Sequence, residues 1–220
     1  MLAKGAGKPL LLSSLPLVVV FFLYLFFNSD ILLYSLSIFS PPILFTLYFF
    51  RDPEREINKG ITSPADGKVQ TLDKEQNTIQ IFMNVWDVHV NRAPWKGRVK
   101  AEKYRDGSHL PAFSEAAEKN ERRVLLLDTE YSKIKVWQIS GLIGRRIVPY
   151  VEKNDEVEKG EKIGMIRFGS KVKLEFSNRV DFSVEEGQRV KAGETTLGVW
   201  DAETDSSSDG DEQEMNGNAR

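Results

Sequence analysis

The chain has 220 residues, with 30 Lys and Arg against 32 Asp and Glu, and a formal net charge of −2. This balance gives no bulk attraction to nucleic acid, so we expect no nucleic-acid partner. The absence of cysteine excludes disulfides, thiolate metal sites and a cysteine nucleophile. The two histidines, His89 and His109, are too few for a multi-histidine metal site, so no metal is expected.

Two long apolar runs without charge, residues 10–27 and 31–50, open the chain around a short polar turn. Each is long enough to cross a bilayer as a helix, so residues 1–50 are predicted to form a transmembrane helical hairpin. Basic residues flank both ends of this hairpin: Lys4, Lys8, Arg51, Arg55 and Lys59. The positive-inside rule then places the rest of the chain on the cytoplasmic side of the cell membrane. A cleaved signal peptide is the alternative, but the second run argues against it.

Short runs typical of strands follow Arg51, separated by Gly, Pro, Asn and Asp. Strands are expected at residues 67–72, 78–82, 88–91, 97–102, 124–128 and 133–139. Residues 112–120 are compatible with either a short helix or a polar loop. The pattern predicts a mainly β domain over residues 51–200, built as a sandwich or barrel. The acidic, serine-rich segment 201–220 is expected to be disordered.

An internal repeat occupies the C-terminal half of this domain. Residues 155–161 (DEVEKGE) are echoed by residues 187–194 (GQRVKAGE), and each copy predicts a tight turn that leads into a strand. This pair resembles the sandwich of biotinyl and lipoyl carrier domains, so a lipoyl-like C-terminal half is expected. A membrane-anchored carrier or adaptor without catalysis is therefore the alternative function. Many β sandwiches use such turns, which weakens that alternative.

Three separate motifs supply an aspartate, a histidine and a serine. Asp66 lies in a turn before a predicted strand, His89 lies in a β-branched run, and Ser170 follows Gly169 between two strand-like runs. In such a set the histidine takes the serine proton, and the aspartate orients the imidazole. Each motif alone is more often structural, so the prediction depends on finding all three together.

In their order along the chain, these motifs resemble the phosphatidylserine decarboxylase family in its short form. That form includes enzymes that act on the ether-lipid analogue archaetidylserine. The resemblance covers roughly residues 45–199. It is carried by Phe49-Phe50-Arg51-Asp52-Pro53, Ser63-Pro64-Ala65-Asp66-Gly67, Asp87-Val88-His89-Val90-Asn91-Arg92, Asn120-Glu121-Arg122, Gly144-Arg145-Arg146-Ile147-Val148 and Arg167-Phe168-Gly169-Ser170.

The resemblance implies a proenzyme that cuts itself between Gly169 and Ser170, with His89 and Asp66 completing the catalytic set. Residue 170 would become a pyruvoyl cofactor that forms a Schiff base with the substrate amine and accepts the electrons left by carbon dioxide. The implied product is the ethanolamine phospholipid, phosphatidylethanolamine or its ether analogue. The chains 1–169 and 170–220 would stay associated, and a homodimer is left open.

The sequence departs from longer family members at Trp86, where they carry an additional histidine. His109 is a weak candidate to replace it, because it also fits a plain loop residue. Arg92, Arg145 and Arg146 are candidate ligands for a substrate phosphate or carboxylate. A solvated cationic face against anionic lipid explains these arginines equally well. The residue that protonates the product, and the choice between ester and ether lipid, are left open.

Overall fold

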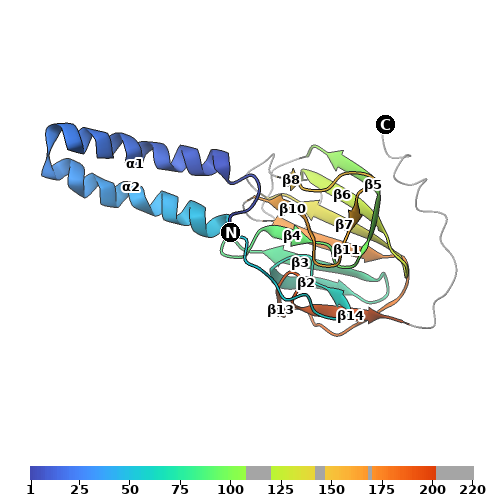
Figure 1. Ribbon diagram of the computed structural model, residues 1–220. Helices are drawn as coiled ribbons and strands as arrows, with labels where there is room; N and C mark the ends of the chain where they lie inside the picture. The colour runs from blue at the N-terminus through green and yellow to red at the C-terminus, as the bar shows by residue number, and fades with distance from the viewer. Residues whose placement is uncertain (108–119, 142–146, 168–169, 202–220) are drawn as a thin grey trace. The chain divides into compact units, whose positions relative to one another are not determined.

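Figure 1 shows the computed structural model, which describes residues 1–107, 120–141, 147–167 and 170–201. The chain divides into two compact units, Met1–Glu54 and Arg55–Arg220. Each unit has its own pattern of burial and hydrogen bonding.

The first unit is a hairpin of two helices, α1 (Gly7–Phe27) and α2 (Asp30–Phe49), as Figure 1 shows. No residue of α1 is buried, and Phe49 is the buried residue of α2, so apolar side chains are exposed around both helices. Their mean hydropathies of 2.5 and 1.6 make both helices apolar enough to cross a membrane. The backbone N–H of Ala3 donates to the carbonyl of Phe50 at 2.8 Å, which joins the two ends of the hairpin. The predicted pair of apolar helices is confirmed.

The second unit is built from short strands, which confirms the prediction of a mainly β domain. In chain order they are β1 (Ile61–Thr62), β2 (Gly67–Asp73), β3 (Thr78–Met83), β4 (Val90–Arg92), β5 (Gly97–Arg105), β6 (Arg122–Asp128), β7 (Lys133–Ile139), β8 (Ile147–Pro149), β9 (Glu156–Val157), β10 (Lys162–Ile166), β11 (Ser170–Phe176), β12 (Val180–Phe182), β13 (Arg189–Val190) and β14 (Thr196–Trp200). The predicted strands recur with ends shifted by up to a few residues. Most of segment 112–120 lies outside the described residues, as does the tail beyond Asp201.

The strands form one eight-stranded sheet, in the order β13-β2-β3-β11-β7-β6-β5-β9, and two three-stranded sheets, β1-β14-β12 and β4-β10-β8. Strand β11 is central, because it pairs with β3 on one side and β7 on the other (Figure 1). Alternate residues of the large sheet, such as Ile81, Val172 and Leu174, are fully buried in one apolar core. The polar residues between them face outward, as the period of a strand requires.

The predicted repeat is present as two matching pairs of loops. We call residues 63–69 with 187–195 the Asp66 repeat, and residues 93–99 with 154–161 the Lys96 repeat. In the first, the N–H of Gly193 donates to the carbonyl of Ser63 at 2.9 Å. In the second, the N–H of Gly160 donates to the carbonyl of Ala93, also at 2.9 Å. Strands β2 and β13 pair in the first repeat as β5 and β9 pair in the second.

One side chain, that of Ile57, packs against both repeats. Gly193 and Gly160 have φ angles of +77° and +80°, a left-handed conformation that favours glycine. A Cβ atom at these positions would lie 2.7 Å and 2.3 Å from Cδ1 of Ile57. Both glycines therefore satisfy a backbone requirement and a packing requirement together. The repeat is a property of the fold, while the assignment of this half as lipoyl-like stays a prediction.

Candidate active site

Strand ends bring the three predicted site residues into one region of the second unit. Asp66 immediately precedes β2, and Ser170 begins β11, with β3 lying between these two strands. Because neighbouring strands lie about 4.8 Å apart, the backbones of β2 and β11 are about 10 Å apart. His89 immediately precedes β4, and its carbonyl accepts the N–H of Ile166 at the end of β10, at 3.1 Å. His89 and Ser170 thus lie at the two ends of the segment that joins β10 to β11.

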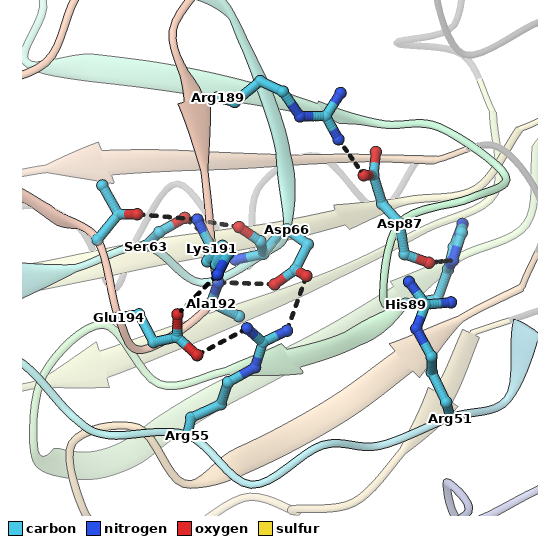
Figure 2. Close-up of polar contacts among 12 residues, drawn as sticks. Arg51, Arg55, Ser63, Asp66, Asp87, His89, Arg189, Lys191, Ala192 and Glu194 are labelled. Carbon is cyan, nitrogen blue, oxygen red and sulfur yellow. Dashed lines mark hydrogen bonds and ion pairs between the residues drawn. The ribbon is translucent and has the colours of Figure 1, made fainter. Parts of the chain in front are cut away.

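The carboxylate of Asp66 is held by an arginine and by the backbone (Figure 2). Its Oδ2 lies 2.7 Å from Nη2 of Arg55, and its Oδ1 accepts the N–H of Ala192 at 2.8 Å. Arg55 also donates to Oε1 of Glu194 at 2.8 Å, so its guanidinium bridges two carboxylates. The side chains of Arg55 and Asp66 are only 6% and 12% exposed. This largely desolvated pair depends on both partners being charged.

The charges of this bridge shift two pKa values. Burial by itself lowers the pKa of Arg55, but the hydrogen bonds and charges of Glu194 and Asp66 outweigh it and raise the pKa above its usual value. The hydrogen bond from Arg55 is the main cause of a lowered pKa at Glu194; burial opposes this shift, and the charges of Arg55 and Lys191 add to it. Arg55 and Glu194 are therefore both ionised at neutral pH.

The imidazole of His89 is fully buried and is oriented by the chain just before it. Its Nδ1 lies 2.9 Å from the carbonyl oxygen of Asp87. A carbonyl can only accept a hydrogen bond, so neutral His89 carries its proton on Nδ1. That tautomer leaves the lone pair on Nε2, the atom that a general base uses.

A second buried carboxylate, that of Asp87, holds the loop that contains His89. Its Oδ2 accepts the N–H of Asn84 at 2.7 Å, and its Oδ1 pairs with Nη2 of Arg189 (Figure 2). The side chain of Asp87 is 8% exposed, whereas that of Arg189 is 69% exposed. The pair thus ties the His89 loop to β13, which belongs to the Asp66 repeat.

Ser170 is fully buried, and its hydroxyl faces a sulfur atom. Its Oγ lies 3.5 Å from Sδ of Met83, the residue opposite it on β3. A thioether is a weak hydrogen-bond acceptor, so it holds the hydroxyl proton less firmly than a carbonyl does. A hydroxyl in this environment suits a nucleophile that must pass its proton to a base.

The structure brings Asp66, His89 and Ser170 to adjoining strand ends, and none of the hydrogen bonds described for these residues joins two of the three side chains. Among the described residues, the contacts of Asp66 go to Arg55 and Ala192, and the Nδ1 partner of His89 is a backbone carbonyl. Catalytic hydrogen bonds often form only in the reacting complex. The roles assigned to these three residues therefore stay predictions.

The remaining predicted residues differ in how the structure places them. Arg92 is buried, and its Nη1 donates to the carbonyl of Gly160 at 2.8 Å, which holds the Lys96 repeat; its role toward substrate stays a prediction. Trp86 is 60% exposed. Four further residues of the prediction lie outside the described residues: His109, Arg145, Arg146 and Gly169.

Sequence reasoning missed Arg55, Asp87, Arg189 and Glu194 as parts of this region. Asp87 lay within the histidine motif but received no role. Glu194 lies within the second copy of the repeat, whose sequence indicates only a turn. Arg55 reads as one of the basic residues that flank the hairpin, and nothing in its local sequence indicates a partner 139 residues away.

Comparison with known proteins agrees with the order of these motifs. The model of the phosphatidylserine decarboxylase family matches residues 43–198, which include every site residue discussed above.

Individual relatives cover most of the chain. A protein of Archaeoglobus fulgidus with the provisional name archaetidylserine decarboxylase proenzyme is 49% identical over 154 residues, which are 69% of this chain and 76% of that protein. The phosphatidylserine decarboxylase proenzyme of Streptomyces avermitilis is 48% identical over 155 residues, 69% of this chain and 72% of that protein. A Methanosarcina barkeri protein with the same provisional name as the first is 40% identical over 200 residues, 90% of this chain and 98% of that protein. The chain therefore belongs to the phosphatidylserine decarboxylase family.

Proposed function

We propose that this chain is a self-processing proenzyme that decarboxylates a serine phospholipid to the corresponding ethanolamine phospholipid. Family membership supports the reaction, and relatives named for phosphatidylserine and for archaetidylserine match it equally well. The substrate class is thus a lipid with a phosphoserine head group, with either an ester or an ether backbone. The observation that carries the proposal is the position of Ser170, buried at the start of β11 with His89 at the preceding strand end.

Processing begins when Nε2 of His89 takes the hydroxyl proton and Oγ of Ser170 attacks the carbonyl carbon of Gly169. The peptide C–N bond breaks, and an ester replaces it. Loss of the Cα proton of residue 170 then breaks its Cβ–Oγ bond. The upstream chain leaves with Oγ in its new terminal carboxylate. Water replaces the nitrogen on the resulting dehydroalanine, which releases ammonia and leaves a pyruvoyl group.

The surroundings of residue 170 fit such a group. The site is fully buried, and the atom facing the lost hydroxyl is the apolar Met83 thioether, so the removal of Oγ leaves no carbonyl or charge without a partner there. The pyruvoyl carbonyl supplies an electron sink for the decarboxylation. The Asp87 carbonyl orients the imidazole of His89, the proposed base.

The hairpin supports a location in the cell membrane, with the β unit on the cytoplasmic side. Both apolar helices are long enough to span a bilayer. Basic residues flank the hairpin, whereas its turn carries one acidic residue. A lipid decarboxylase needs access to a bilayer surface, which such an anchor provides. Family membership and the anchor thus support the same assignment.

Strand pairing supports a stable association of the two products of cleavage. Residues 170–176 form β11, which pairs on one side with β3 and on the other with β7. Strands β13 and β14 also come from the smaller product and pair with β2 and β1 of the larger one. Strands of the smaller chain thus pair with strands of the larger chain at several places, and we expect both chains to remain in one folded unit.

Intact-mass spectrometry of the purified membrane protein tests this proposal. We expect two chains, residues 1–169 and 170–220, with no free amine at the start of the second. Ser170→Ala should leave one chain of 25.0 kDa without decarboxylase activity, because it removes both the nucleophile and the source of the pyruvoyl group. Ser170→Cys should form a thioester that added hydroxylamine cleaves.

Ser140→Ala is the matched control, because Ser140 is also fully buried but its hydroxyl donates to the carbonyl of Glu121 at 3.1 Å. This control should process like the parent. A single uncut chain in membranes that decarboxylate the lipid would refute the proposal, and would favour a decarboxylase of another kind. An uncut chain without activity would favour the carrier or adaptor.

A further inference from the structure

A line of buried polar side chains crosses the apolar core and ends at Ser170. Nη1 of Arg123 on β6 donates to Oε1 of Gln138 on β7 at 3.0 Å, and Nε2 of Gln138 donates to Oδ1 of Asn91 on β4 at 2.8 Å. Nδ2 of Asn91 lies 3.6 Å from Sδ of Met83, the sulfur atom that faces the Ser170 hydroxyl. All five residues are at most 1% exposed. Burying this many polar groups is costly unless each is satisfied, as here.

The arginine at one end fixes the direction of the whole line. A guanidinium can only donate hydrogen bonds, so the amide oxygen of Gln138 must face Arg123. The amide nitrogen of Gln138 then faces Asn91, whose oxygen must accept from it. Asn91 is left with its N–H group toward Met83. The orientation of both amides thus follows from the donor-only chemistry of the Arg123 guanidinium.

Arg123 is itself held rigidly at its end of the line. Its Nε donates to Oε1 of Glu102 at 2.6 Å, its Nη1 also donates to the carbonyl of Ile163 at 3.0 Å, and its Nη2 donates to the carbonyl of Val151. These contacts, with the one to Gln138, involve every nitrogen of the guanidinium. A side chain with this many partners, in a core position, cannot rotate without breaking several buried hydrogen bonds.

A glycine makes room for the central amide. A Cβ atom at Gly164 on β10 would lie 2.8 Å from Nε2 of Gln138 and 3.0 Å from the carbonyl oxygen of Val148. The backbone of β10 therefore passes close to the amide of Gln138. This close packing restricts the amide to the position in which it connects Arg123 to Asn91.

We propose that Arg123, Gln138, Asn91 and Met83 form a positioning relay for the Ser170 hydroxyl. The inference rests on the proposed role of Ser170 as the processing nucleophile. The donor that Asn91 presents to the sulfur keeps Met83 in place, and the sulfur holds the hydroxyl in one rotamer. Because the acceptor is weak, the hydroxyl proton remains easy to transfer to a base.

The relay acts on the step that uses Oγ. That oxygen leaves residue 170 with the upstream chain, so the relay should govern the rate of self-cleavage and have little effect on decarboxylation afterwards. A residue that served only to pack the core would instead affect both activities and the stability together. The two roles therefore differ in the ratio of the loss of self-cleavage rate to the loss of decarboxylation rate, which can be measured.

Two nearly isosteric variants of the full chain test the relay. Met83→Leu keeps the apolar volume and removes the sulfur acceptor. Gln138→Glu keeps the shape but places a carboxylate oxygen against Asn91, which must then rotate its amide and turn its oxygen toward Met83. The sulfur atom of Met83 would then lose the N–H donor that holds it in place. We expect self-cleavage to slow about threefold to tenfold in the first variant and about tenfold or more in the second.

Cleavage is followed on denaturing gels after synchronised synthesis of each full-length chain, and kcat and KM are measured on the processed fraction. The controls are Met165→Leu, at a second fully buried methionine outside the relay, and Gln80→Glu, at a partly buried glutamine on β3. We expect both controls to cleave like the parent, and the relay variants to show kcat within about twofold once processed.

Cleavage of Met83→Leu at the rate of Met165→Leu would overturn the relay even if Gln138→Glu failed to fold. A parallel fall in cleavage, kcat and thermal stability would overturn it too, because it would show a packing role alone. If the parent chain itself is never cleaved, the proposed function fails and the relay falls with it. If the parent is cleaved and the relay variants are cleaved at the same rate as the controls, the relay is contradicted and the proposed function is not.

Discussion

The Asp66 repeat and the Lys96 repeat share a backbone but carry opposite charges before their outgoing strands. In the first, the N–H of Val69 donates to the carbonyl of Gln188 at 2.9 Å; in the second, the N–H of Val99 donates to that of Asp155 at the same distance. The residue before the first glycine of the strand is Asp66 in one repeat and Lys96 in the other.

Their surroundings explain this difference. The side chain of Asp66 is 12% exposed and pairs with Arg55, whereas that of Lys96 is 54% exposed and lies 3.2 Å from Glu130, which is itself 47% exposed. Strand β2, which follows Asp66, is separated from β11 and Ser170 by β3 alone. Strand β5, which follows Lys96, lies near the opposite edge of the sheet. The two repeats thus share one backbone arrangement. The Asp66 repeat is the candidate catalytic copy because it lies nearer to Ser170 in the sheet, and the Lys96 repeat is structural.

The largest expected difference comes from neutralising each charge. Asp66→Asn leaves the buried guanidinium of Arg55 short of one partner and should lower the free energy of unfolding by about 3 kcal/mol. It should also slow self-cleavage by orders of magnitude, with product detectable after long incubation. Lys96→Gln removes an exposed ion pair and should change stability by less than about 1 kcal/mol. Denaturant unfolding and a cleavage time course measure both, and equal effects at the two positions would remove the distinction between the repeats.

Alanine at the two left-handed glycines should separate stability from function. Gly193→Ala and Gly160→Ala each force a side chain into a left-handed conformation and against Ile57, which should cost about 1–2 kcal/mol or more in either repeat. Only Gly193 lies between Ala192 and Glu194, which contact the Asp66–Arg55 bridge.

We therefore expect similar losses of melting temperature and a specific loss of self-cleavage in Gly193→Ala. Ile57→Ala in each background removes the steric part of the cost and should recover part of the stability. A cleavage defect as large in Gly160→Ala as in Gly193→Ala would contradict the assignment of the site to the Asp66 repeat.

The smallest expected effect is on pH dependence. Because the pKa of Glu194 is lowered in the folded chain, its ionised form stabilises the fold above its usual value of 4.5, and this contribution is lost as the pH falls below that value. Glu194→Gln should flatten this part of the pH profile, with an effect of about 0.5 kcal/mol at neutral pH, since the side chain is 31% exposed. Melting temperatures of the parent and of Glu194→Gln, measured between about pH 3.5 and 7, test this contribution.

Glu161→Gln is the control in the Lys96 repeat, where the carboxylate of Glu161 accepts the N–H of Glu158 at 2.8 Å. That variant removes no contact to an arginine among the described partners of Glu161. If Glu161→Gln reduced the pH dependence of the melting temperature more than Glu194→Gln does, the bridge from Glu194 to Arg55 would add nothing to stability.

Much of the fold could be predicted from the sequence because its signals are local. The runs around residues 10–27 and 31–50 predicted two helices, and alternation in segments such as 133–139 predicted strands, since both depend on neighbours within a few residues. The repeat was visible because its two loops use similar turn residues. The motifs around Asp66, His89 and Ser170 predicted the family, although their roles in cleavage stay predictions.

The partners of these residues could not be predicted in the same way. The Asp87 carbonyl, and not a carboxylate, is the Nδ1 partner of His89, and a carbonyl leaves no trace in the residue type. Arg123, Gln138 and Asn91 look like ordinary polar residues of β-strands. Their connection exists only because β6, β7 and β4 enclose the same part of the core.

The sequence by itself determined the two apolar helices, the mainly β class of the following domain, the repeat and the likeness to a family of decarboxylases, because periodicity, turn chemistry and motif order are written along the chain. Only the tertiary structure decided that Arg55 bridges Asp66 and Glu194, and that Ser170 faces the sulfur of Met83. Those contacts depend on which strands become neighbours in the sheets. That choice is made by burying the whole apolar core at once, and no short stretch of sequence contains it.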